Sequence, residues 1–371
     1  MYAWALRPLL FLLPPGTAHA LAFAGMAPLE YVAPVRALTR ALLAPRDPRI
    51  AVSAMGLTFP SPLGLAGGFD KNGLRPRALA ALGFGHLELG TVTAQAQDAN
   101  PRPNMFRLPR DRALVNRLGF PNEGAARLAH RLLARGHGRG SAGIPVGVSI
   151  GKSRAVPIDD LERVIDDYVA AFTPPRAMGT DFVVVNVSSP NTRDLRAMQT
   201  APLARALLTA LVKANEGMAD GRAGAAVPLL LKIAPDLDDA AVESLLAVVE
   251  EVGLAGVVAT NTTIARTGLA TDAARVEAVG AGGLSGAPLR ARALEVVKRV
   301  RTRLGPKAVV VGVGGVERAE HAMALVRAGA DLVQMYTGFI YEGPGVPSRI
   351  ARDLAAMVTR EGATTLRELR G

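Results

Sequence analysis

The densest group of residues able to do chemistry is the run Asn-Val-Ser-Ser-Pro-Asn-Thr at positions 186–192. An asparagine side chain offers both a hydrogen-bond donor and an acceptor, so Asn186 and Asn191 suit a ring that presents imide edges. A serine hydroxyl between them can act as a base if its proton has a relay. Ser188 and Ser189 could instead cap a helix, and the residues alone leave both interpretations open.

Two lysines add positive charge to the candidate chemistry. Lys71 lies in Asp-Lys-Asn-Gly, and Lys232 follows three leucines, which places its ammonium near the end of a buried strand. Such a lysine either stabilises negative charge on a cofactor or an enolate, or pairs with a neighbouring acid. Both roles remain open for each lysine.

Glycine-rich runs at 282–286 and 312–315 indicate an anion site. Glycine lets backbone N–H groups approach a phosphate closely, and a helix N-terminus favours negative charge. We expect the 282–286 run to open a helix and to present donors to the same phosphate as the 312–315 run. A plain tight turn is the alternative for the latter.

The elements that must position these residues repeat one theme from Val52 onward: a short apolar strand, a polar or glycine-rich turn, and an amphipathic helix. Near-continuous Val, Ile and Leu suit parallel strands buried on both faces. Eight units predict a (β/α)₈ TIM barrel, whose chemistry lies at the carboxyl ends of its strands. A doubly wound sheet is disfavoured because residues 67–71 do not match the dinucleotide-binding glycine pattern. The strands are predicted at 63–66, 86–89, 146–150, 182–187, 229–233, 256–259, 308–313 and 332–335.

Composition narrows the chemistry of this rim. The 371-residue chain has no cysteine, which excludes disulfides, thiolate metal sites and a cysteine base. Asp70 is the one acidic residue in the predicted strand-end turns, so we expect no metal site and no paired-carboxylate catalysis. A net charge of +11 favours anionic partners, while 4% aromatic residues disfavour stacking on single-stranded nucleic acid.

The N-terminal 46 residues are predicted to form a helical unit separate from the barrel at 47–371. We expect one helix from Ala18, capped by Thr17, to about Gly25, and a second over 32–43. No apolar run reaches the roughly 20 residues of a membrane span, and a secretory signal peptide is disfavoured by a short, proline-interrupted apolar region. The helices, apolar on one side and basic on the other, either lie on a membrane surface or pack on the barrel.

The chain resembles the membrane-associated, quinone-dependent class of dihydroorotate dehydrogenases. Each motif alone is weak, but six occur in the family's order between about residues 63 and 339, and the N-terminal helices also fit. The motifs are Asp-Lys-Asn-Gly, Asn-Arg-Leu-Gly-Phe, Asn-Val-Ser-Ser-Pro-Asn-Thr, Ala-Thr-Asn-Thr-Thr, Gly-Gly-Leu-Ser-Gly and Gly-Val-Gly-Gly.

The resemblance implies an oxidoreductase that acts on a CH–CH bond. It would oxidise (S)-dihydroorotate to orotate in de novo pyrimidine (UMP) biosynthesis, with FMN as hydride acceptor and a membrane quinone as final electron acceptor. It also implies a peripheral protein on the cytoplasmic side of the cell membrane, with no nucleic-acid partner and no obligate protein partner. The absence of cysteine excludes the soluble class, whose base is a cysteine.

The resemblance assigns roles residue by residue. Ser189 matches the base that removes the C5 proton. Two departures from the family pattern are Ser149, where an asparagine usually contacts the flavin, and Thr337, where a serine is usual. Substrate contacts are implied for Lys71, Asn116, Arg117, Leu118, Gly119, Phe120, Asn186, Asn191, Asn261 and Thr262. FMN contacts are implied for Gly67, Gly68, Phe69, Asp70, Lys71, Thr91, Ser149, Asn186, Lys232, Thr260, Gly286, Gly315, Tyr336 and Thr337, and a quinone tunnel for His19, Arg36, Arg107 and Tyr336.

Two rival functions remain at this stage. Another FMN barrel, such as a hydroxy-acid oxidase or a relative that uses NAD, is one; a basic scaffold that binds nucleic acid is the other. A hydroxy-acid oxidase would need a histidine base at a strand end. None of the histidines stands there: His19, His86, His130, His137 and His321.

Overall fold

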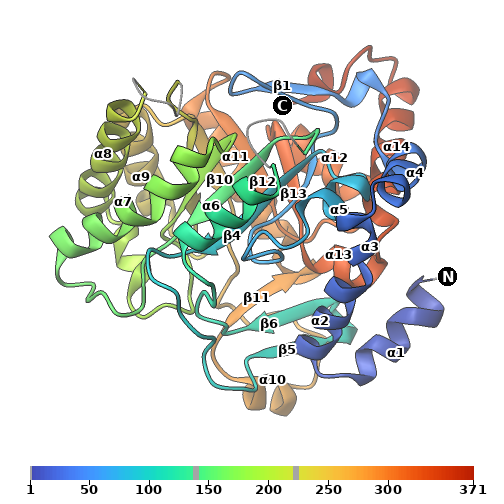
Figure 1. The fold of residues 1–371 in the computed structure, drawn as a ribbon, viewed down its shortest axis with the longest axis horizontal. Helices are drawn as coiled ribbons and strands as arrows, with labels where there is room; N and C mark the ends of the chain where they lie inside the picture. The colour runs from blue at the N-terminus through green and yellow to red at the C-terminus, as the bar shows by residue number, and fades with distance from the viewer. Residues whose placement is uncertain (1, 137–141, 220–224) are drawn as a thin grey trace.

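A closed barrel of eight parallel strands forms the centre of the computed structural model, which describes residues 2–136, 142–219 and 225–371. The strand order around the barrel is β10-β12-β13-β3-β4-β7-β8-β9. Figure 1 labels β4, β10, β12 and β13 near its centre. Four strands coincide with the predicted ranges and four differ by one to three residues at one end, so the predicted TIM barrel is confirmed. The strands are β3 (Leu63–Leu65), β4 (His86–Val92), β7 (Val146–Ile150), β8 (Phe182–Asn186), β9 (Leu229–Ile233), β10 (Gly256–Ala259), β12 (Val309–Val313) and β13 (Leu332–Met335).

Helices surround the barrel and bury its outer surface, except α10, which packs on the small sheet described below. Several begin at an aspartate whose carboxylate accepts from the first-turn amides, as Asp160 and Asp238 do, and end at a left-handed glycine such as Gly179 or Gly253. These caps fix where each helix stops and where the next strand begins. The helices are α5 (Pro76–Ala81), α6 (Ala125–Ala134), α7 (Leu161–Met178), α8 (Ala201–Gly217), α9 (Asp239–Val252), α10 (Ala273–Val279), α11 (Arg290–Leu304), α12 (Ala319–Arg327), α13 (Thr337–Glu342) and α14 (Val346–Arg360).

A small antiparallel sheet lies beyond the barrel, at the lower edge of Figure 1, in the order β11-β6-β5. It consists of β5 (Met105–Leu108), β6 (Ala113–Asn116) and β11 (Gly283–Gly286). The expectation that residues 282–286 open a helix is therefore wrong: they pair with β6, and a 3₁₀ turn at Ala287–Leu289 separates them from α11. A separate hairpin joins β1 (Val52–Ala54) to β2 (Leu57–Phe59).

The N-terminal helices pack together on one flank of the barrel (Figure 1). Thr17 lies inside α2, which begins at Pro15 after an N-cap at Pro14, so the predicted Thr17 cap is wrong. A proline at the first helical position pre-sets φ and lacks only an N–H that would have no partner there. The elements are a π-helix (Tyr2–Leu6), α1 (Arg7–Leu12), α2 (Pro15–Gly25), α3 (Ala27–Tyr31) and α4 (Ala33–Leu43).

These helices present one side to the barrel and the other to solvent. Phe23 and Met26 are buried in the main hydrophobic core, whereas the side chains of Leu12, Leu38 and Leu42 are 82%, 64% and 69% exposed. One side of the unit therefore packs on the barrel, as one alternative predicted, while contact of the exposed side with a membrane stays a prediction. Within the described residues, no helix is both long and apolar enough to cross a membrane.

Candidate active site

A cavity lies where the barrel strands end, between their carboxyl ends and the small β11-β6-β5 sheet, with about 1070 Å³ of empty space that includes its opening to solvent. Seven of the eight strands contribute lining residues at or just after their last positions, as the barrel architecture requires. The predicted site residues that line it are Gly67, Gly68, Lys71, Thr91, Asn116, Leu118, Gly119, Phe120, Asn186, Ser189, Asn191, Lys232, Thr260, Asn261, Thr262, Gly286, Gly315, Tyr336 and Thr337.

Two predicted FMN contacts, Phe69 and Asp70, have side chains that face away from this cavity. Both Asp70 carboxylate oxygens accept from backbone amides, at 2.8 Å from Leu74 and 2.7 Å from Arg75. The Phe69 ring packs against Phe339 at 5.2 Å. These side chains hold the loop after β3 in place instead of lining the cavity.

Arg117 and Ser149 also lie outside the cavity lining. The Arg117 guanidinium donates to the carbonyls of Pro103 (3.1 Å) and Val279 (2.8 Å) on the outer side of the small sheet. Ser149 is fully buried, and its Oγ lies 2.9 Å from Thr91 Oγ1. Because Thr91 itself lines the cavity, Ser149 can act on a ligand only through Thr91.

The two adjacent serines of the 186–192 run have opposite surroundings. Ser188 Oγ donates to Asn186 Oδ1 at 3.1 Å and accepts from Asn261 Nδ2 at 2.9 Å. Ser189 Oγ accepts from the Asn191 amide at 3.2 Å, and Ser189, not Ser188, lines the cavity. The structure thus decides which hydroxyl is available to a ligand.

Asparagine side chains form the polar wall around Ser189. Asn191 Nδ2 donates to Asn116 Oδ1 at 3.0 Å, and Asn186 Nδ2 donates to Thr91 Oγ1 at 3.0 Å. Asn261 Nδ2 also lies 3.2 Å from Asn186 Oδ1. These amides hold one another in fixed orientations, so their remaining donors and acceptors are pre-organised for a planar ligand with alternating polar groups.

The two lysines differ in their partners. Lys71 Nζ donates to the Gly68 carbonyl at 2.6 Å. Burial lowers the pKa of Lys71 to about 8, although the nearby Asp70 carboxylate opposes that shift. Lys232 Nζ lies 2.9 Å from Glu88 Oε1 in a buried ion pair, so Lys232 both pairs with an acid and lines the cavity.

Backbone glycines form a cradle at one end of the cavity. Gly286 and Gly315 have φ of +103° and +68°, in the region that favours glycine. A Cβ at Gly315 would lie 2.8 Å from Arg290 Cβ and 3.1 Å from the Gly286 carbonyl oxygen. The cradle is therefore too close-packed for any side chain, and it leaves room for backbone N–H groups to meet an anion.

Two buried residues that the sequence did not single out bear on which ligand fits. Gln334 lines the cavity, yet both its amide nitrogen and its oxygen lack a hydrogen-bond partner in the described structure, and so does Glu88 Oε2. Burying such groups without partners is costly. A flat ligand with both donors and acceptors, such as a flavin ring, fits this need, and the glycine cradle fits its phosphate.

A row of aromatic rings leads from α2 to the cavity. The His19 ring lies 5.1 Å from the Phe69 ring, and the Phe69 ring lies 5.7 Å from the Tyr336 ring, measured between centroids. Burial, and to a lesser extent the Lys71 charge, lowers the pKa of His19 to about 4, so this row is uncharged near neutral pH. Tyr336 lines the cavity.

The other two predicted tunnel residues lie apart from this row. Arg107 on β5 donates to the carbonyls of Phe11 (3.2 Å) and Leu13 (2.7 Å), where α1 ends. Arg36 on α4 donates to the Glu30 carbonyl at 2.8 Å. The structure therefore links His19 to Tyr336 through Phe69. It places Arg107 beside the start of α2 and Arg36 between α3 and α4.

Acidic and histidine residues are sparse around the cavity. Among the described residues, no group of three or more Asp, Glu, His or Cys side chains is arranged to hold a metal ion. His86 stands at the first position of β4, at the opposite end of the strand from the cavity. His137 lies outside the described residues.

Comparisons with known proteins bear on what the cavity binds. The family model described as dihydroorotate dehydrogenase matches residues 49–358. Proteins named dihydroorotate dehydrogenase (quinone) from Thermobifida fusca and Nocardia farcinica are 47% and 49% identical; the matches cover 95% and 100% of this chain, and 92% and 96% of those proteins. The crystal structure of an Eimeria tenella enzyme of this type in complex with ferulenol has a TM-score of 0.83 and 31% identity, covering 96% of this chain and 95% of that one.

Proposed function

This chain belongs to the dihydroorotate dehydrogenase family, and from that premise we propose that it oxidises (S)-dihydroorotate to orotate in pyrimidine biosynthesis, with FMN as hydride acceptor and a membrane quinone as final electron acceptor. The observation that carries the proposal is the position of Ser189. Its hydroxyl faces the strand-end cavity, whereas the neighbouring Ser188 hydroxyl is engaged by Asn186 and Asn261.

Ser189 Oγ is the proposed base for the C5 proton of the substrate. A hydrogen bond from the Asn191 amide stabilises negative charge on that oxygen, so it helps the hydroxyl to give up its own proton to a relay as the oxygen takes the C5 proton. Such general-base assistance contributes about 10²–10⁴ in rate. The FMN, when bound, supplies the two-electron acceptor for the hydride that leaves C6.

The asparagines and Lys71 orient the substrate in this proposal. Lys71 supplies a cation for the substrate carboxylate, while Asn116, Asn191 and Asn261 supply donors and acceptors for its amide edges. Leu118, Gly119 and Phe120 line the outer part of the cavity and exclude water from the reacting face. Orientation of this kind is worth a large share of the barrier because it replaces lost translational freedom.

The cofactor assignment rests on the fit between the cavity lining and one flavin mononucleotide. The family is flavin-dependent, and a single glycine cradle at Gly286 and Gly315 suits a single phosphate. Lys232 and Gln334 would face the flavin ring, and Thr91, Thr260 and Thr337 add hydroxyls. For Phe69, Asp70 and Ser149 we propose a supporting role behind the cavity wall.

We further propose that residues 1–46 give the quinone access to the flavin. Exposed apolar side chains on α1, α2 and α4 would rest on the cytoplasmic side of the cell membrane as a peripheral contact. His19 and Tyr336 would line the quinone's path to the cavity, with Arg107 beside its entrance. The proposed function involves no nucleic-acid partner and no obligate protein partner.

The test is anaerobic mixing of the purified yellow protein with (S)-dihydroorotate. We expect the visible flavin absorbance to bleach in one turnover and to return when a quinone is added. A colourless protein that does not bind added FMN would contradict the proposal. So would a bound flavin that stays oxidised in the presence of excess dihydroorotate. A flavin that stays oxidised with dihydroorotate but is reduced by a 2-hydroxy acid would favour the hydroxy-acid oxidase alternative.

A further inference from the structure

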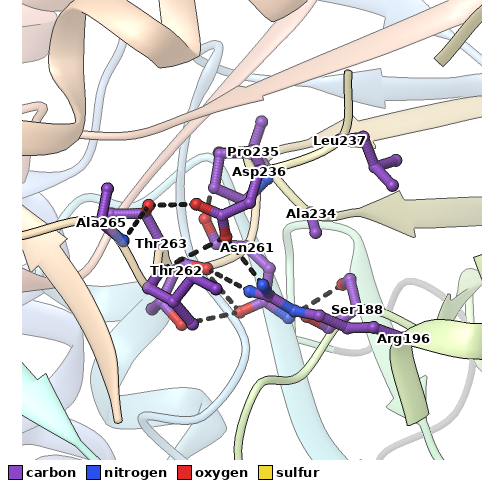
Figure 2. Close-up of polar contacts among 12 residues, drawn as sticks. Ser188, Arg196, Ala234, Pro235, Asp236, Leu237, Asn261, Thr262, Thr263 and Ala265 are labelled. Atoms are coloured by element: carbon purple, nitrogen blue, oxygen red, sulfur yellow. Dashed lines mark hydrogen bonds and ion pairs between the residues drawn. The ribbon is translucent and has the colours of Figure 1, made fainter. Parts of the chain in front are cut away.

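Arg196, which no feature of the sequence pointed to, ties together the loops that follow three barrel strands. It lies on a 3₁₀ helix (Leu195–Gln199) just after the loop that carries Ser189. Its Nε donates to the Ser188 carbonyl at 3.2 Å and its Nη2 donates to the Thr262 carbonyl at 3.0 Å. Figure 2 shows the guanidinium between Ser188, Thr262 and Asp236, which belong to the loops after β8, β10 and β9.

The contact with Ser188 acts on the peptide group that carries the base. The Ser188 carbonyl and the Ser189 nitrogen belong to one planar peptide unit, so fixing that carbonyl fixes where the Ser189 side chain starts. In the described structure, the Ser188 carbonyl accepts from Arg196 and from no other donor. The amides of both residues are held by asparagines: the Ser188 amide donates to Asn186 Oδ1 at 3.2 Å and the Thr262 amide donates to Asn261 Oδ1 at 2.8 Å, so what Arg196 adds is a hold on each carbonyl.

Asp236 holds the guanidinium in this orientation. Its Oδ2 lies 2.8 Å from Arg196 Nη1 and also accepts from the Ile264 amide at 3.2 Å, while its Oδ1 accepts from Thr263 Oγ1. The Asp236 and Arg196 side chains are 19% and 23% exposed, so solvent competes only partly with the pair. A carboxylate bound on both oxygens leaves the guanidinium little freedom.

The loop that carries Asp236 is itself rigidly held. Arg292 on α11 donates to the carbonyls on either side of Asp236, at 2.9 Å to Pro235 and 2.8 Å to Leu237. The Ala234 amide donates to Gln199 Oε1 at 2.8 Å, which links the same loop back to the 3₁₀ helix of Arg196. The anchor for Arg196 is therefore a braced loop, not a mobile side chain.

We propose that Arg196, oriented by Asp236, is the positioning residue that sets Ser189 against the substrate. The inference rests on the proposed function, because it needs Ser189 to be the base. Residues 187–192 have no regular helix or strand to hold them. Asn186 and Asn261 hold the Ser188 amide and hydroxyl, and in the described structure Arg196 is the one donor to the carbonyl of the Ser188–Ser189 peptide. A misplacement of about 1 Å at a reacting group can cost about 10²-fold in rate. The three contacts use three different nitrogens of the planar guanidinium, a spread that the single nitrogen of lysine cannot reproduce.

The test replaces the planar guanidinium of Arg196 with a lysine ammonium, which keeps the positive charge. In Arg196→Lys we expect the anaerobic rate of flavin reduction at saturating dihydroorotate to fall about 10²-fold. The flavin content and the dissociation constant for orotate, read from the change in the flavin spectrum, should stay within about threefold of the unmodified protein, because the asparagines keep their own anchors. The rate should therefore fall without a matching loss of binding.

Arg205→Lys is the matched control. Arg205 makes a two-pronged ion pair with Glu251, at 2.8–3.0 Å, but both residues are exposed on α8 and α9 and touch no strand-end loop. We expect its reduction rate and orotate affinity to equal those of the unmodified protein. A fall in Arg205→Lys equal to that in Arg196→Lys would show a general effect of losing an ion pair and would overturn the proposal.

Asp236→Asn keeps the proposal testable if Arg196→Lys does not fold. The isosteric amide weakens the hold on Arg196 without emptying the space, so we expect a loss of about tenfold in the reduction rate with orotate affinity unchanged. Normal reduction rates in the folded variants, or equal losses in rate and in orotate affinity, would remove the positioning role. If the unmodified protein is not reduced by dihydroorotate, the proposed function itself fails, and the two failures are thereby distinguished.

Discussion

At the scale of single residues, the site is decided by which polar groups are already engaged. Ser188 and Ser189 are neighbours of the same type, and the sequence could not separate them. Hydrogen bonds from residues far away in the chain do so, because Asn261 occupies Ser188 and leaves Ser189 at the cavity. The Ser188 hydroxyl already donates one hydrogen bond and accepts another, and this difference supports Ser189 as the proposed base.

Lys71 gives the binding of an acidic ligand a pH dependence. Its folded-state pKa of about 8 lies below the ordinary lysine value, so the cation dominates well below pH 8 and is lost as the pH rises through it. We expect the orotate dissociation constant to be constant below about pH 7 and to rise about tenfold per pH unit above 8. Titration by flavin absorbance from pH 6 to 9.5 measures this.

Lys71→Arg is the control for that titration, because a guanidinium does not lose its proton in this range. We expect its orotate affinity to be independent of pH up to 9.5, whatever its absolute value. A persistent tenfold loss per unit in Lys71→Arg would assign the titration to another group.

The residues that sequence reasoning missed share one property. Glu88 pairs with Lys232 and Arg196 contacts Asp236 and Thr262, all far away in the chain, while Gln334 faces a cavity formed by distant segments, so no local motif shows their roles. Glu88 lies inside a wholly buried strand, where in the sequence it only interrupts an apolar run. The pattern of apolar and polar residues predicts strand ends well, but it does not predict which side chains meet across a barrel.

At the scale of elements, the strands that the sequence predicts are those whose burial requires mainly apolar residues. β7, β9 and β10 are mainly apolar and buried, interrupted only by Ser149 in β7 and Lys232 in β9, and their bounds match the predicted ranges. β11 was not predicted as a strand because its sequence, Gly-Leu-Ser-Gly, has little apolar pattern. It becomes a strand through pairing with β6, some 170 residues earlier, which local propensity cannot show.

The glycine cradle makes an element-level prediction about the cofactor. In Gly315→Ala we expect FMN affinity to fall by at least about tenfold, because the new Cβ would press on Arg290 and on the Gly286 carbonyl. The left-handed backbone adds a strain cost of about 1 kcal/mol. Fluorescence titration of the apoprotein with FMN measures the affinity.

Gly253→Ala is a matched control for backbone strain. Gly253 has φ +75° at the end of α9, but a Cβ there meets nothing within 4 Å. We expect a similar loss of thermal stability with FMN affinity unchanged. Equal losses of FMN affinity in the two variants would show that strain, and not the cradle, controls cofactor binding.

At the scale of the whole molecule, the N-terminal helices give the protein one apolar flank. The unit is fastened to the barrel by buried groups such as Phe23 and by Glu30, whose Oε2 accepts from the Ala78 amide at 3.1 Å. Its outer side chains stay exposed next to Arg40, on a chain of net charge +11. Apolar and basic groups together favour an anionic lipid surface.

The flank can be tested without removing it. In the double variant Leu38→Glu, Leu42→Glu we expect co-sedimentation with phosphatidylcholine–phosphatidylglycerol vesicles to fall at least about tenfold, because each leucine contributes about 1.5–3 kcal/mol when buried. Turnover with a long-tailed quinone should fall with it, while anaerobic flavin reduction should not change. Leu133→Glu, at an exposed leucine of α6, should leave vesicle binding intact. Undiminished vesicle binding in the double variant would move the membrane contact elsewhere.

The most direct measurement for the whole account is the anaerobic rate of flavin reduction by (S)-dihydroorotate in Ser189→Ala and Ser188→Ala, followed by stopped-flow absorbance. We predict that Ser189→Ala retains its flavin and binds orotate, yet loses at least about 10²-fold in that rate. Ser188→Ala, which removes only a hydrogen-bond bridge, should lose less than about tenfold. Full-rate reduction in Ser189→Ala, or a larger loss in Ser188→Ala, would contradict the assignment of the cavity-facing serine as the base.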